Sequence, residues 1–337
     1  MTFKIKIQPS GIEFTAEEGE TVVEAARFHD IPMPFSCLGG SCGSCKGKIL
    51  SGQIRYEEDM LPALSETEKG LNMSLFCQAI AESDLEIEIR SIGVTKDIVV
   101  KTLPCRVAQM NKLAPDVMQL FLKLPMVEEF NYLPGQYLDI LWRDGRRRSF
   151  SIANVAKAHE LLEQHVRQID GGAFTDFVFN EMSEKALLRF EGPLGTFYFR
   201  EDSPAPKIFI AGGTGFAPMK AMLEQAFALE RTEPLYLYWG VRDLQSLYMK
   251  ELPQQWAEAH ENFHFIPVLS EPKEADLWSG RTGFVHQAVL NDFKQLNDFQ
   301  IYASGPPAMI DAARDTFLQK GMLIDDFFSD PFNFSIN

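Results

Sequence analysis

The sequence lacks any long hydrophobic run, although 45% of its 337 residues are hydrophobic. A transmembrane helix needs about 20 consecutive apolar residues, so we expect no membrane insertion. The opening residues, MTFKIKIQPSG, also lack the apolar core and the small-residue cleavage site of a secretory signal. We therefore expect a cytoplasmic globular protein.

Positive charge is scarce, because 32 Lys and Arg against 47 Asp and Glu give a formal net charge of −15. Proteins that follow a nucleic-acid backbone need clustered positive charge, so no nucleic acid is expected as a partner. The first 97 residues carry 16 acidic and 9 basic side chains. This excess fits simple solubility and equally an acidic docking face for a basic redox partner, and both interpretations stay open.

Cysteine is also scarce, and five residues are too few for a disulfide scaffold in a chain of this length. Their spacing is nevertheless informative. Cys37, Cys42 and Cys45 lie close together, Cys77 follows much later, and Cys105 stands apart. A C-x₄-C-x₂-C run with a distant fourth cysteine is the ligand pattern of plant-type [2Fe–2S] clusters. The alternatives are a structural zinc site, which prefers two separated C-x₂-C pairs, and a chance group of reduced thiols.

The residues around these cysteines suggest a small α+β domain. Residues 4–7 and 12–15 alternate polar and apolar side chains, which predicts an opening hairpin. Residues 21–26 predict a short helix with a capping box between Thr21 and Glu24. Together with the glycine-rich cysteine loop, these segments resemble the plant-type ferredoxin domain. The resemblance implies a β-grasp fold over residues 1–97, with Cys37, Cys42, Cys45 and Cys77 as cluster ligands and Cys105 as a structural thiol.

Short strand patterns recur between residues 98 and 202, which favours an antiparallel barrel or sandwich. Three arginines precede an alternating segment at 149–154, and a Gly-Gly pair precedes a helical stretch at 174–182 whose first amides could hold a phosphate. Each signal alone is weak. Their order, R-x-[FY]-S, then GGxx[ST], then GPLGTF, resembles the FAD-binding barrel of the ferredoxin–NADP⁺ reductase superfamily.

That resemblance implies a set of flavin contacts. Arg148 would pair with the flavin pyrophosphate, Phe150 would stack along the flavin, and Ser151 would bond near flavin N5. Phe150 replaces the commoner tyrosine and removes one hydroxyl donor, so FMN stays open beside FAD. The expected cofactor-binding residues of this segment are Arg148, Ser149, Phe150, Ser151, Gly171, Gly172 and Thr175.

The last segment changes to a parallel α/β pattern. Residues 207–211 form a short apolar run, followed by the loop GGTG and a helical stretch at 219–229. Strand, glycine loop and helix is the arrangement that places a pyrophosphate on a helix N-terminus. Further strand patterns at 235–242, 263–268 and 300–307 alternate with helical ones, the first of which is expected to start at Ser246. This alternation predicts a doubly wound parallel sheet.

GGTGxxP together with GPPxM resembles the pyridine-nucleotide domain of the same superfamily. The resemblance places Gly213, Thr214 and Gly215 along the cofactor pyrophosphate, and Gly305 and Pro306 beside the nicotinamide. Ser304 stands where relatives often carry cysteine. At the adenosine end, Asp243 suits a ribose diol whereas Arg242 would favour a 2′-phosphate; NADH is the expected donor and NADPH stays open. Phe332, in a segment similar to the S-D-x-F ends of relatives, is expected near the flavin, and Ser151, Ser304 and Phe332 are the expected catalytic residues.

The three modules, at 1–97, 98–202 and 203–337, resemble the reductase components of aromatic-ring dioxygenases and of methane or phenol monooxygenases, and the CDP-6-deoxy-glucoseen reductases. The resemblance implies electron flow from NADH to FAD, to the cluster, and on to a partner protein at the ferredoxin domain. Flavin must lie between a two-electron donor and a one-electron acceptor. The alternatives are an NAD(P)H:flavin or ferric reductase and, in another class, a redox sensor or electron-storage module. His159 and His165 are interpreted as structural or solvated.

Overall fold

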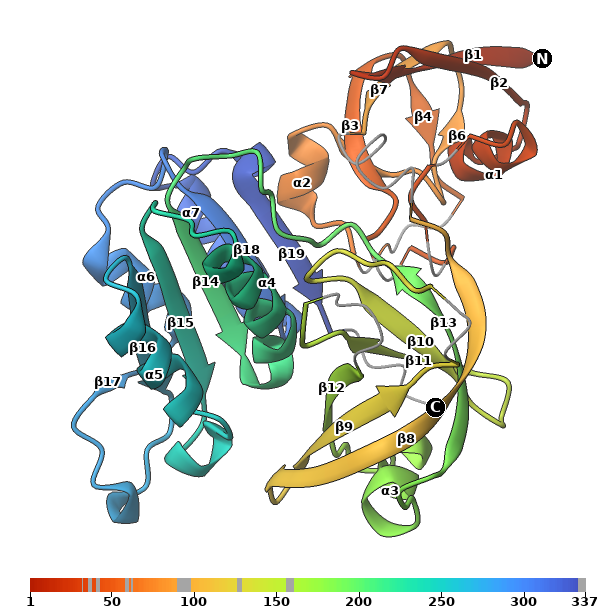
Figure 1. The fold of residues 1–337 in the computed structure, drawn as a ribbon. Helices are drawn as coiled ribbons and strands as arrows, with labels where there is room; N and C mark the ends of the chain where they lie inside the picture. Colours follow the sequence, from red (N-terminus) through yellow and green to blue (C-terminus); the bar gives the residue numbers. More distant parts are fainter. Residues whose placement is uncertain are drawn as a thin grey trace. The chain divides into compact units, whose positions relative to one another are not determined.

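The computed structural model describes residues 1–31, 33–35, 38–40, 43–57, 61, 63–89, 98–125, 129–155 and 161–332 (Figure 1). Residue contacts group the chain into two units, one mainly Met1–Val99 and the other mainly Val100–Phe332. The second unit contains both a barrel-like sheet and a parallel sheet, so the predicted boundary between residues 202 and 203 stays a prediction. No helix in the described ranges is long and apolar enough to span a membrane.

In the described part of the first unit, five strands form a mixed sheet in the order β2-β1-β7-β3-β5. Its elements are β1 (Thr2–Gln8), β2 (Ile12–Glu17), α1 (Val22–Phe28), β3 (Lys46–Ser51), β4 (Ile54–Arg55), α2 (Glu66–Gly70), β5 (Met73–Leu75), β6 (Ile80–Ala81) and β7 (Leu85–Glu88). The predicted opening hairpin is confirmed, since β1 and β2 pair antiparallel. Ile5 and Ile7 are fully buried and face the core. The predicted capping box is also confirmed, because Glu24 N–H donates to Thr21 Oγ1 and Thr21 N–H donates to Glu24.

Six antiparallel strands of the described residues form the barrel-like sheet, in the order β11-β10-β13-β8-β9-β12. They are β8 (Lys101–Ala114), β9 (Val117–Lys123), β10 (Tyr137–Leu141), β11 (Arg147–Ser151), β12 (Leu162–Arg167) and β13 (Leu187–Leu194). The two edge strands β11 and β12 contact each other and so close the sheet. Helix α3 (Ala173–Asn180) adds Phe174 and Val178 to the core enclosed by these strands.

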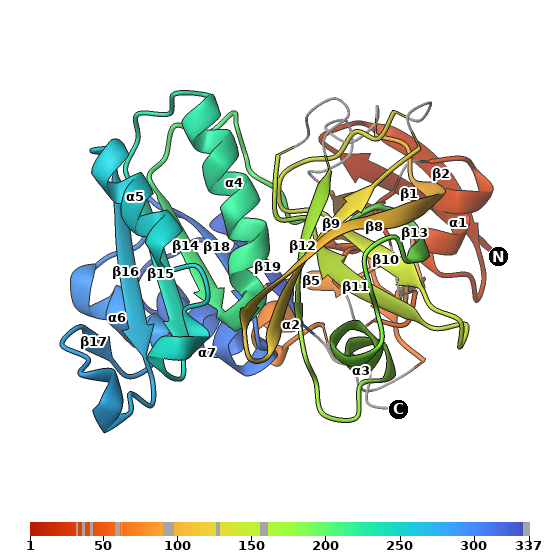
Figure 2. The same cartoon turned by 60° about the horizontal axis from the view of Figure 1, so that its bottom comes forward.

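Residues 203–332 are all described and form a six-stranded parallel sheet in the order β17-β16-β15-β14-β18-β19. The strands are β14 (Lys207–Gly212), β15 (Leu235–Val241), β16 (Phe263–Leu269), β17 (Arg281–Thr282), β18 (Gln300–Gly305) and β19 (Phe327–Pro331). The helices are α4 (Phe216–Ala228), α5 (Glu251–Ala259), α6 (Val285–Asp292) and α7 (Pro307–Leu318). They cover both faces of the sheet (Figure 2).

The sequence pattern explains this double cover. Along β14, Ile208 and Ile210 enter the core under α6 and α7, whereas Phe209 and Ala211 enter the core under α4. A strand that is buried on both faces therefore appears as a continuous apolar run. Two boundaries differ from the prediction. Helix α4 begins three residues early, and the helix expected from Ser246 is a 3₁₀ turn, η2 (Leu244–Ser246), followed by α5.

Candidate functional site

The fold brings two of the four predicted cluster cysteines to one end of a strand pair. Strand β3 pairs antiparallel with β5, with Lys46 opposite Leu75. Cys45 precedes β3 and Cys77 follows β5, so both thiols lie at the same end of that pair. Both cysteines are buried, and Phe76 N–H donates to Cys45 O at 3.2 Å. Cys37 and Cys42 lie outside the described residues.

Hydrogen bonds hold the described part of the cysteine loop against the neighbouring chain. Leu38 and Gly40 have positive φ angles of 55° and 70°. Gln78 Nε2 donates to Leu38 O at 2.6 Å, and Ala63 N–H donates to Gly40 O at 3.1 Å. A Cβ on Gly40 would lie 3.1 Å from the Leu61 side chain, so the loop packs closely on the chain below it. Buried thiols beside a closely packed loop fit an iron–sulfur cluster.

The arginine run on the barrel divides into different roles. Arg147 makes a two-bond ion pair with Glu191, at 2.7 and 3.1 Å. Arg148 Nη2 instead bonds Asp144 at the adjacent turn, at 3.1 Å. In the β10–β11 register Arg148 lies opposite Ile140. Arg148 is therefore held on β11 by a single ion pair whose partners are 20% and 34% exposed, and a flavin phosphate could replace Asp144 as the partner of the guanidinium.

The neighbouring predicted flavin residues lie on both faces of β11. Ser149 donates to Asp139 at 2.6 Å, and burial raises the pKa of that carboxyl. The Phe150 ring contacts the Phe174 ring at 5.4 Å. Ser151 is buried. The alternation of a strand explains why Ser149 and Ser151 share one face while Phe150 faces the helix.

The Gly171-Gly172 turn leads directly into α3, as predicted. Gly172 is the N-cap residue of the helix. Thr175 Oγ1 donates to Gly172 O at 3.0 Å and accepts from Ile169 N–H at 3.2 Å. The Thr175 hydroxyl thus shapes the turn from inside, and the first amides of α3 remain the groups that suit a phosphate.

The glycine loop after β14 packs against the end of β18. A Cβ on Gly215 would overlap Ser304 O, so only glycine fits there. Gly213 has a φ of 56°, and Trp239 Nε1 donates to its carbonyl at 2.9 Å. The loop, with Thr214 buried beside it, therefore lies at the carboxyl edge of the sheet, where doubly wound folds bind ligands.

Arg167 is a residue of this site that sequence reasoning missed. It ends β12 of the barrel, and a Cβ on Gly213 would lie only 2.5 Å from its Nη1. Arg167 Nε is 3.1 Å from the Asp116 carboxylate. Its Nη2 is buried and has no hydrogen-bond partner within the described residues. A buried donor without an acceptor beside a glycine loop fits a bound phosphate.

A second group joins the barrel to the parallel sheet beside Ser151. Ser151 Oγ donates to Asp330 Oδ2 at 3.4 Å. Asp330 is the register partner of Ser304 on the neighbouring strand. Ser304 Oγ is buried and faces the Asp330 carboxyl, without a hydrogen bond of good geometry among the described residues. Phe332 N–H donates to Gly305 O at 2.9 Å, so three predicted catalytic residues and Gly305 gather around Asp330.

The environment of Asp330 changes its acidity. Burial raises the pKa of the carboxyl to about 7, against the opposing effect of the Ser151 and Ser304 hydroxyls. The carboxyl therefore exchanges its proton near neutral pH. A group of this kind can hold a proton or a negative charge at the place where the barrel-like sheet meets the parallel sheet.

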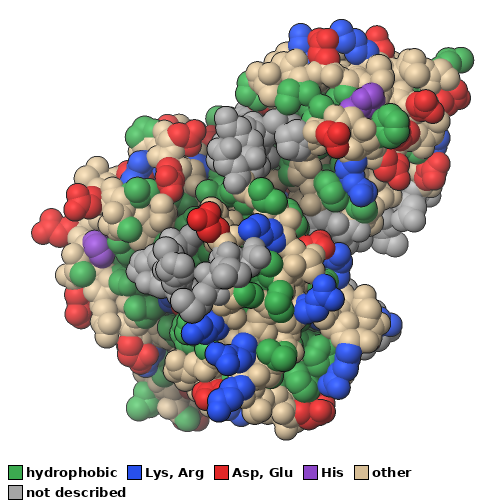
Figure 3. All heavy atoms as spheres, turned by 45° about the vertical axis from the view of Figure 1, so that its right-hand side comes forward, with side chains coloured by type: hydrophobic (Ala, Val, Ile, Leu, Met, Phe, Trp, Pro, Cys, Tyr) green, Lys and Arg blue, Asp and Glu red, His purple; other side chains and the backbone are tan. Residues whose placement is uncertain are grey.

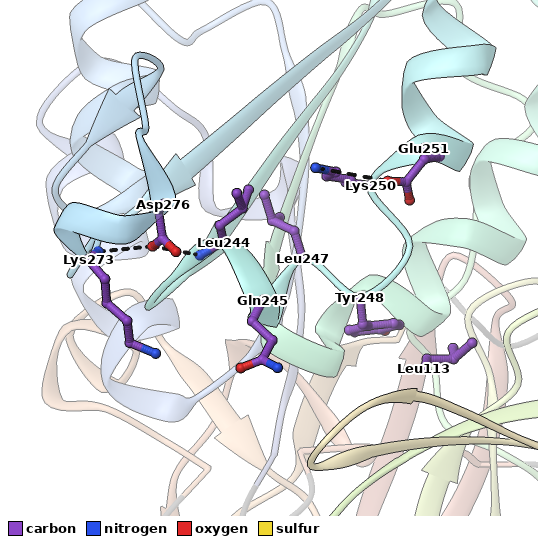
Figure 4. A pocket seen from close by; sticks show the side chains of 9 residues that line it. All are labelled: Leu113, Leu244, Gln245, Leu247, Tyr248, Lys250, Glu251, Lys273 and Asp276. Carbon is purple, nitrogen blue, oxygen red and sulfur yellow. Dashed lines mark hydrogen bonds and ion pairs between the residues drawn. The ribbon is translucent and has the colours of Figure 1, made fainter.

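A shallow pocket of about 560 Å³, open to solvent, lies past the carboxyl ends of β15 and β16 (Figure 4). Its lining residues come from the end of β8, from η2 and from the loop after β16: Leu113, Leu244, Gln245, Leu247, Tyr248, Lys250, Glu251, Lys273 and Asp276. Asp243 adjoins this pocket and accepts from Ser246 Oγ at 2.8 Å. Its other oxygen pairs with Lys273, which lowers the pKa of Asp243. Arg242 is exposed.

Comparison with known proteins agrees with this geometry. Three family models match consecutive parts of the chain: a 2Fe-2S iron-sulfur cluster binding domain at residues 5–82, an oxidoreductase FAD-binding domain at 104–199, and an oxidoreductase NAD-binding domain at 209–315. The CDP-6-deoxy-L-threo-D-glycero-4-hexulose-3-dehydrase reductase of Yersinia pestis is 40% identical over 332 residues, which cover 98% of this chain and 99% of the relative. The chain belongs to the iron–sulfur flavoprotein reductases of the ferredoxin–NADP⁺ reductase superfamily.

Other relatives of this reductase serve other systems. The phenol 2-monooxygenase reductase component DmpP of a Pseudomonas species is 32% identical, with 98% of this chain and 95% of the relative covered. The crystal structure of the Amycolatopsis cytochrome P450 reductase GcoB is similar with a TM-score of 0.75 and 31% identity, and 98% of each chain is covered. The reductase is an oxidoreductase with domains for a [2Fe–2S] cluster, FAD and NAD, as its sequence predicted.

Proposed function

We propose that the reductase takes electrons from NADH and delivers them, through FAD and its own [2Fe–2S] cluster, to a separate protein. FAD, when bound, supplies the conversion between a two-electron hydride donor and a one-electron acceptor. The observation that carries the proposal is the meeting of Ser151 with Asp330 at 3.4 Å. This contact joins β11, the strand that carries the proposed flavin residues and is called the flavin strand below, to β19 of the parallel sheet. Strand β19 pairs with β18, which carries the proposed nicotinamide residues Ser304 and Gly305.

The residues of the chain have separable tasks in this proposal. Arg148 and the first amides of α3 hold the flavin phosphates, and Ser151 orients the flavin ring. Gly213–Gly215 and Arg167 hold the dinucleotide pyrophosphate. Ser304 and Gly305 line the nicotinamide, and Phe332 lies beside them through its bond to Gly305. Proximity alone of this kind accounts for a large part of a transfer rate.

NADH is the proposed donor in preference to NADPH. Asp243 keeps its negative charge, because pairing with Lys273 lowers its pKa. A carboxylate at the end of the second parallel strand accepts hydrogen bonds from a ribose diol and repels a 2′-phosphate. Lys273 is 62% exposed, so water screens its charge and it offsets part of this repulsion.

The proposed partner is a dehydrase of the nucleotide-linked deoxyhexulose type. The support is the full-length 40% identity to the Yersinia dehydrase reductase, against 32% to the phenol monooxygenase component. Acidic and basic side chains are interspersed on the side of the first unit that Figure 3 shows, and some acidic ones are paired, as Glu13 is with Lys4. The acidic docking face therefore stays a prediction.

A coupling assay tests the partner. The holoprotein is mixed with NADH and either a purified CDP-hexulose dehydrase with its substrate or a phenol hydroxylase component with phenol. We expect substrate-dependent NADH oxidation with the dehydrase to exceed that with the hydroxylase at least about tenfold, a preference of 1.4 kcal/mol or more. Equal rates of NADH oxidation with the two partners, or a faster rate with the hydroxylase, would overturn the assignment of a dehydrase partner. The proposed path from NADH through FAD to the cluster would not be affected.

Substitution of Asp330 is expected to change the pH dependence of flavin reduction. Nicotinamide becomes positively charged when it gives up hydride, and an ionised Asp330 stabilises that charge. Because the pKa of Asp330 is about 7, the rate of flavin bleaching by NADH in a stopped-flow instrument should rise with pH between about 6 and 8. Asp330→Asn should lower the rate about tenfold or more at pH 8 and remove the rise.

The control for this prediction is Asp292→Asn. Asp292 also accepts a partly buried hydrogen bond, from Tyr238 at 2.5 Å, and it pairs with Arg281, but it lies on α6, away from Ser151. This variant should keep the wild-type pH profile. A rate that rises equally with pH in Asp330→Asn would show that another group titrates.

A further inference from the structure

A buried polar network joins the barrel to the parallel sheet, away from Ser151. Glu163 and His165 come from β12, Lys220 from α4, and Tyr248 from the segment after η2. Each is at most 8% exposed. The sequence suggested a structural or solvated His165; the structure shows it fully enclosed by polar and aromatic partners. His159 lies outside the described residues.

Glu163 is an ionised carboxylate inside this network. Its Oε1 accepts from Gln119 Nε2 at 2.6 Å and lies 2.9 Å from His165 Nε2, and its Oε2 accepts from Lys220 Nζ at 2.8 Å. Burial alone would raise the pKa of Glu163, but His165 and Lys220 lower it to about 2. Glu163 therefore only accepts hydrogen bonds.

The charge of Glu163 determines the direction of every bond beyond it. Burial lowers the pKa of His165, against the opposite effect of Glu163, and this direction favours the neutral ring with a single proton. Because Glu163 has no proton to donate, His165 Nε2 must carry that proton, and Nδ1 is a bare acceptor. Tyr248 Oη, 2.9 Å from Nδ1, must then donate to it. With a neutral His165 ring, the chain of bonds runs from the Tyr248 hydroxyl to the Glu163 carboxylate.

Tyr248 also lines the pocket past the ends of β15 and β16 (Figure 4). Its ring meets the His165 ring edge-on at 5.3 Å and the Trp239 ring edge-on at 5.1 Å. The hydroxyl is bonded to the barrel while the ring borders the pocket of the parallel sheet. The orientation of the Tyr248 ring thus depends on His165, a residue of the barrel.

The opposite end of the network reaches the flavin strand. Lys220 Nζ donates to Ala153 O at 3.0 Å, and Ala153 lies two residues after Ser151. Lys220 also pairs with Glu224 on its own helix. Helix α4, which carries Lys220, begins directly after the glycine loop Gly213–Gly215. The network therefore connects the Tyr248 ring of the pocket, the dinucleotide loop and the flavin strand.

We propose that Glu163 and His165 are positioning residues for dinucleotide binding: from the barrel, they hold Tyr248 in place where its ring lines the pocket for the adenosine end. The proposal rests on the proposed function, because it takes the pocket as the site of the adenosine end. Neither residue touches the reacting atoms. Their effect should appear in affinity rather than in the chemical step.

The test uses the full-length holoprotein and ADP-ribose, a ligand that has the adenosine end and no nicotinamide. Tyr248→Phe removes one oxygen and keeps the ring. We expect it to weaken ADP-ribose binding in isothermal titration calorimetry about five- to tenfold, the worth of one buried hydrogen bond, and to raise KM for NADH by the same factor with kcat unchanged.

Three further variants separate positioning from general damage. His165→Leu should match Tyr248→Phe, and the double variant should be no weaker than either alone, because both remove the same bond. His165→Gln should recover much of the affinity, since its amide can accept from Tyr248 and donate to Glu163. Glu163→Gln should weaken binding by a similar factor, because an amide no longer enforces the Nε2–H form of His165.

Tyr238→Phe is the matched control. Its hydroxyl also makes a partly buried bond, to Asp292, but Tyr238 does not line the pocket. It should lower the melting temperature without changing ADP-ribose affinity. Wild-type affinity for ADP-ribose in Tyr248→Phe, or additive losses of affinity in the double variant, would overturn this proposal. The proposed function would stand as long as NADH still bleaches the flavin of the wild-type protein. Wild-type protein that binds no ADP-ribose and is not reduced by NADH would overturn the proposed function as well.

Discussion

Replacing Cys45 with serine is expected to abolish the reduction of cytochrome c by NADH while leaving NADH-driven flavin bleaching intact. Cys45 and Cys77 lie buried at one end of the β3–β5 pair, and a plant-type cluster needs a thiolate at each position. The loss of a mere supporting contact in a metal site costs about 10- to 100-fold in affinity or activity. Loss of a ligand should therefore lower one-electron transfer at least about 100-fold.

Cys105→Ala is the control for this result. Cys105 is buried in the barrel core, and burial raises the pKa of its thiol to about 12, so it is a protonated thiol at neutral pH. This variant should keep the visible absorption of the cluster and near wild-type cytochrome c reduction. Cytochrome c reduction that survives in Cys45→Ser would show that the flavin serves the acceptor directly, and a flavin or ferric reductase would become the better account.

Arg167→Leu is expected to raise KM for NADH by about 10- to 100-fold. The guanidinium lies against Gly213 and has a buried Nη2 without a partner in the described part of the chain. A charge-assisted hydrogen bond to phosphate is worth about 1.5–3 kcal/mol. Because phosphate is bound equally before and during hydride transfer, KM should change and kcat should remain, as steady-state kinetics can measure.

Arg189→Leu provides the comparison for Arg167. Arg189 is an exposed arginine on β13 of the same sheet. Its loss removes the same charge from the reductase without touching the glycine loop, so KM should stay within about twofold. An equal rise of KM in both variants would indicate general electrostatic attraction of the dinucleotide. An unchanged KM in Arg167→Leu would remove the residue from the site.

Local signals predicted much of the fold. Thr21 and Glu24 formed the expected capping box because both partners lie within one helical turn. The apolar run at β14 became a buried parallel strand, since it needs nothing beyond its own pattern to indicate two covered faces. The predicted start of the helix at Ser246 was wrong. Asp243 caps a 3₁₀ turn there, and α5 begins only at Glu251, after the segment that contains Tyr248.

The residues that sequence reasoning missed are those brought together by tertiary packing. Asp330 lies in the segment from which Phe332 was chosen, but only the pairing of β18 with β19 places it beside Ser304. Arg167 belongs to the barrel and Gly213 to the parallel sheet, 46 positions apart in the chain. Glu163 and Lys220 carry no motif. Nothing in the spacing of such residues indicates contact, because the domains must first dock.

The most direct test of the account is an anaerobic titration of the purified holoprotein with NADH, followed by absorption and low-temperature electron paramagnetic resonance. We expect the flavin absorption to bleach and a rhombic signal of a reduced [2Fe–2S] cluster to appear in the same titration. Both changes should be present in wild-type protein and only the bleaching in Cys45→Ser. Bleached flavin without any cluster signal in the wild-type protein would contradict the proposed electron path.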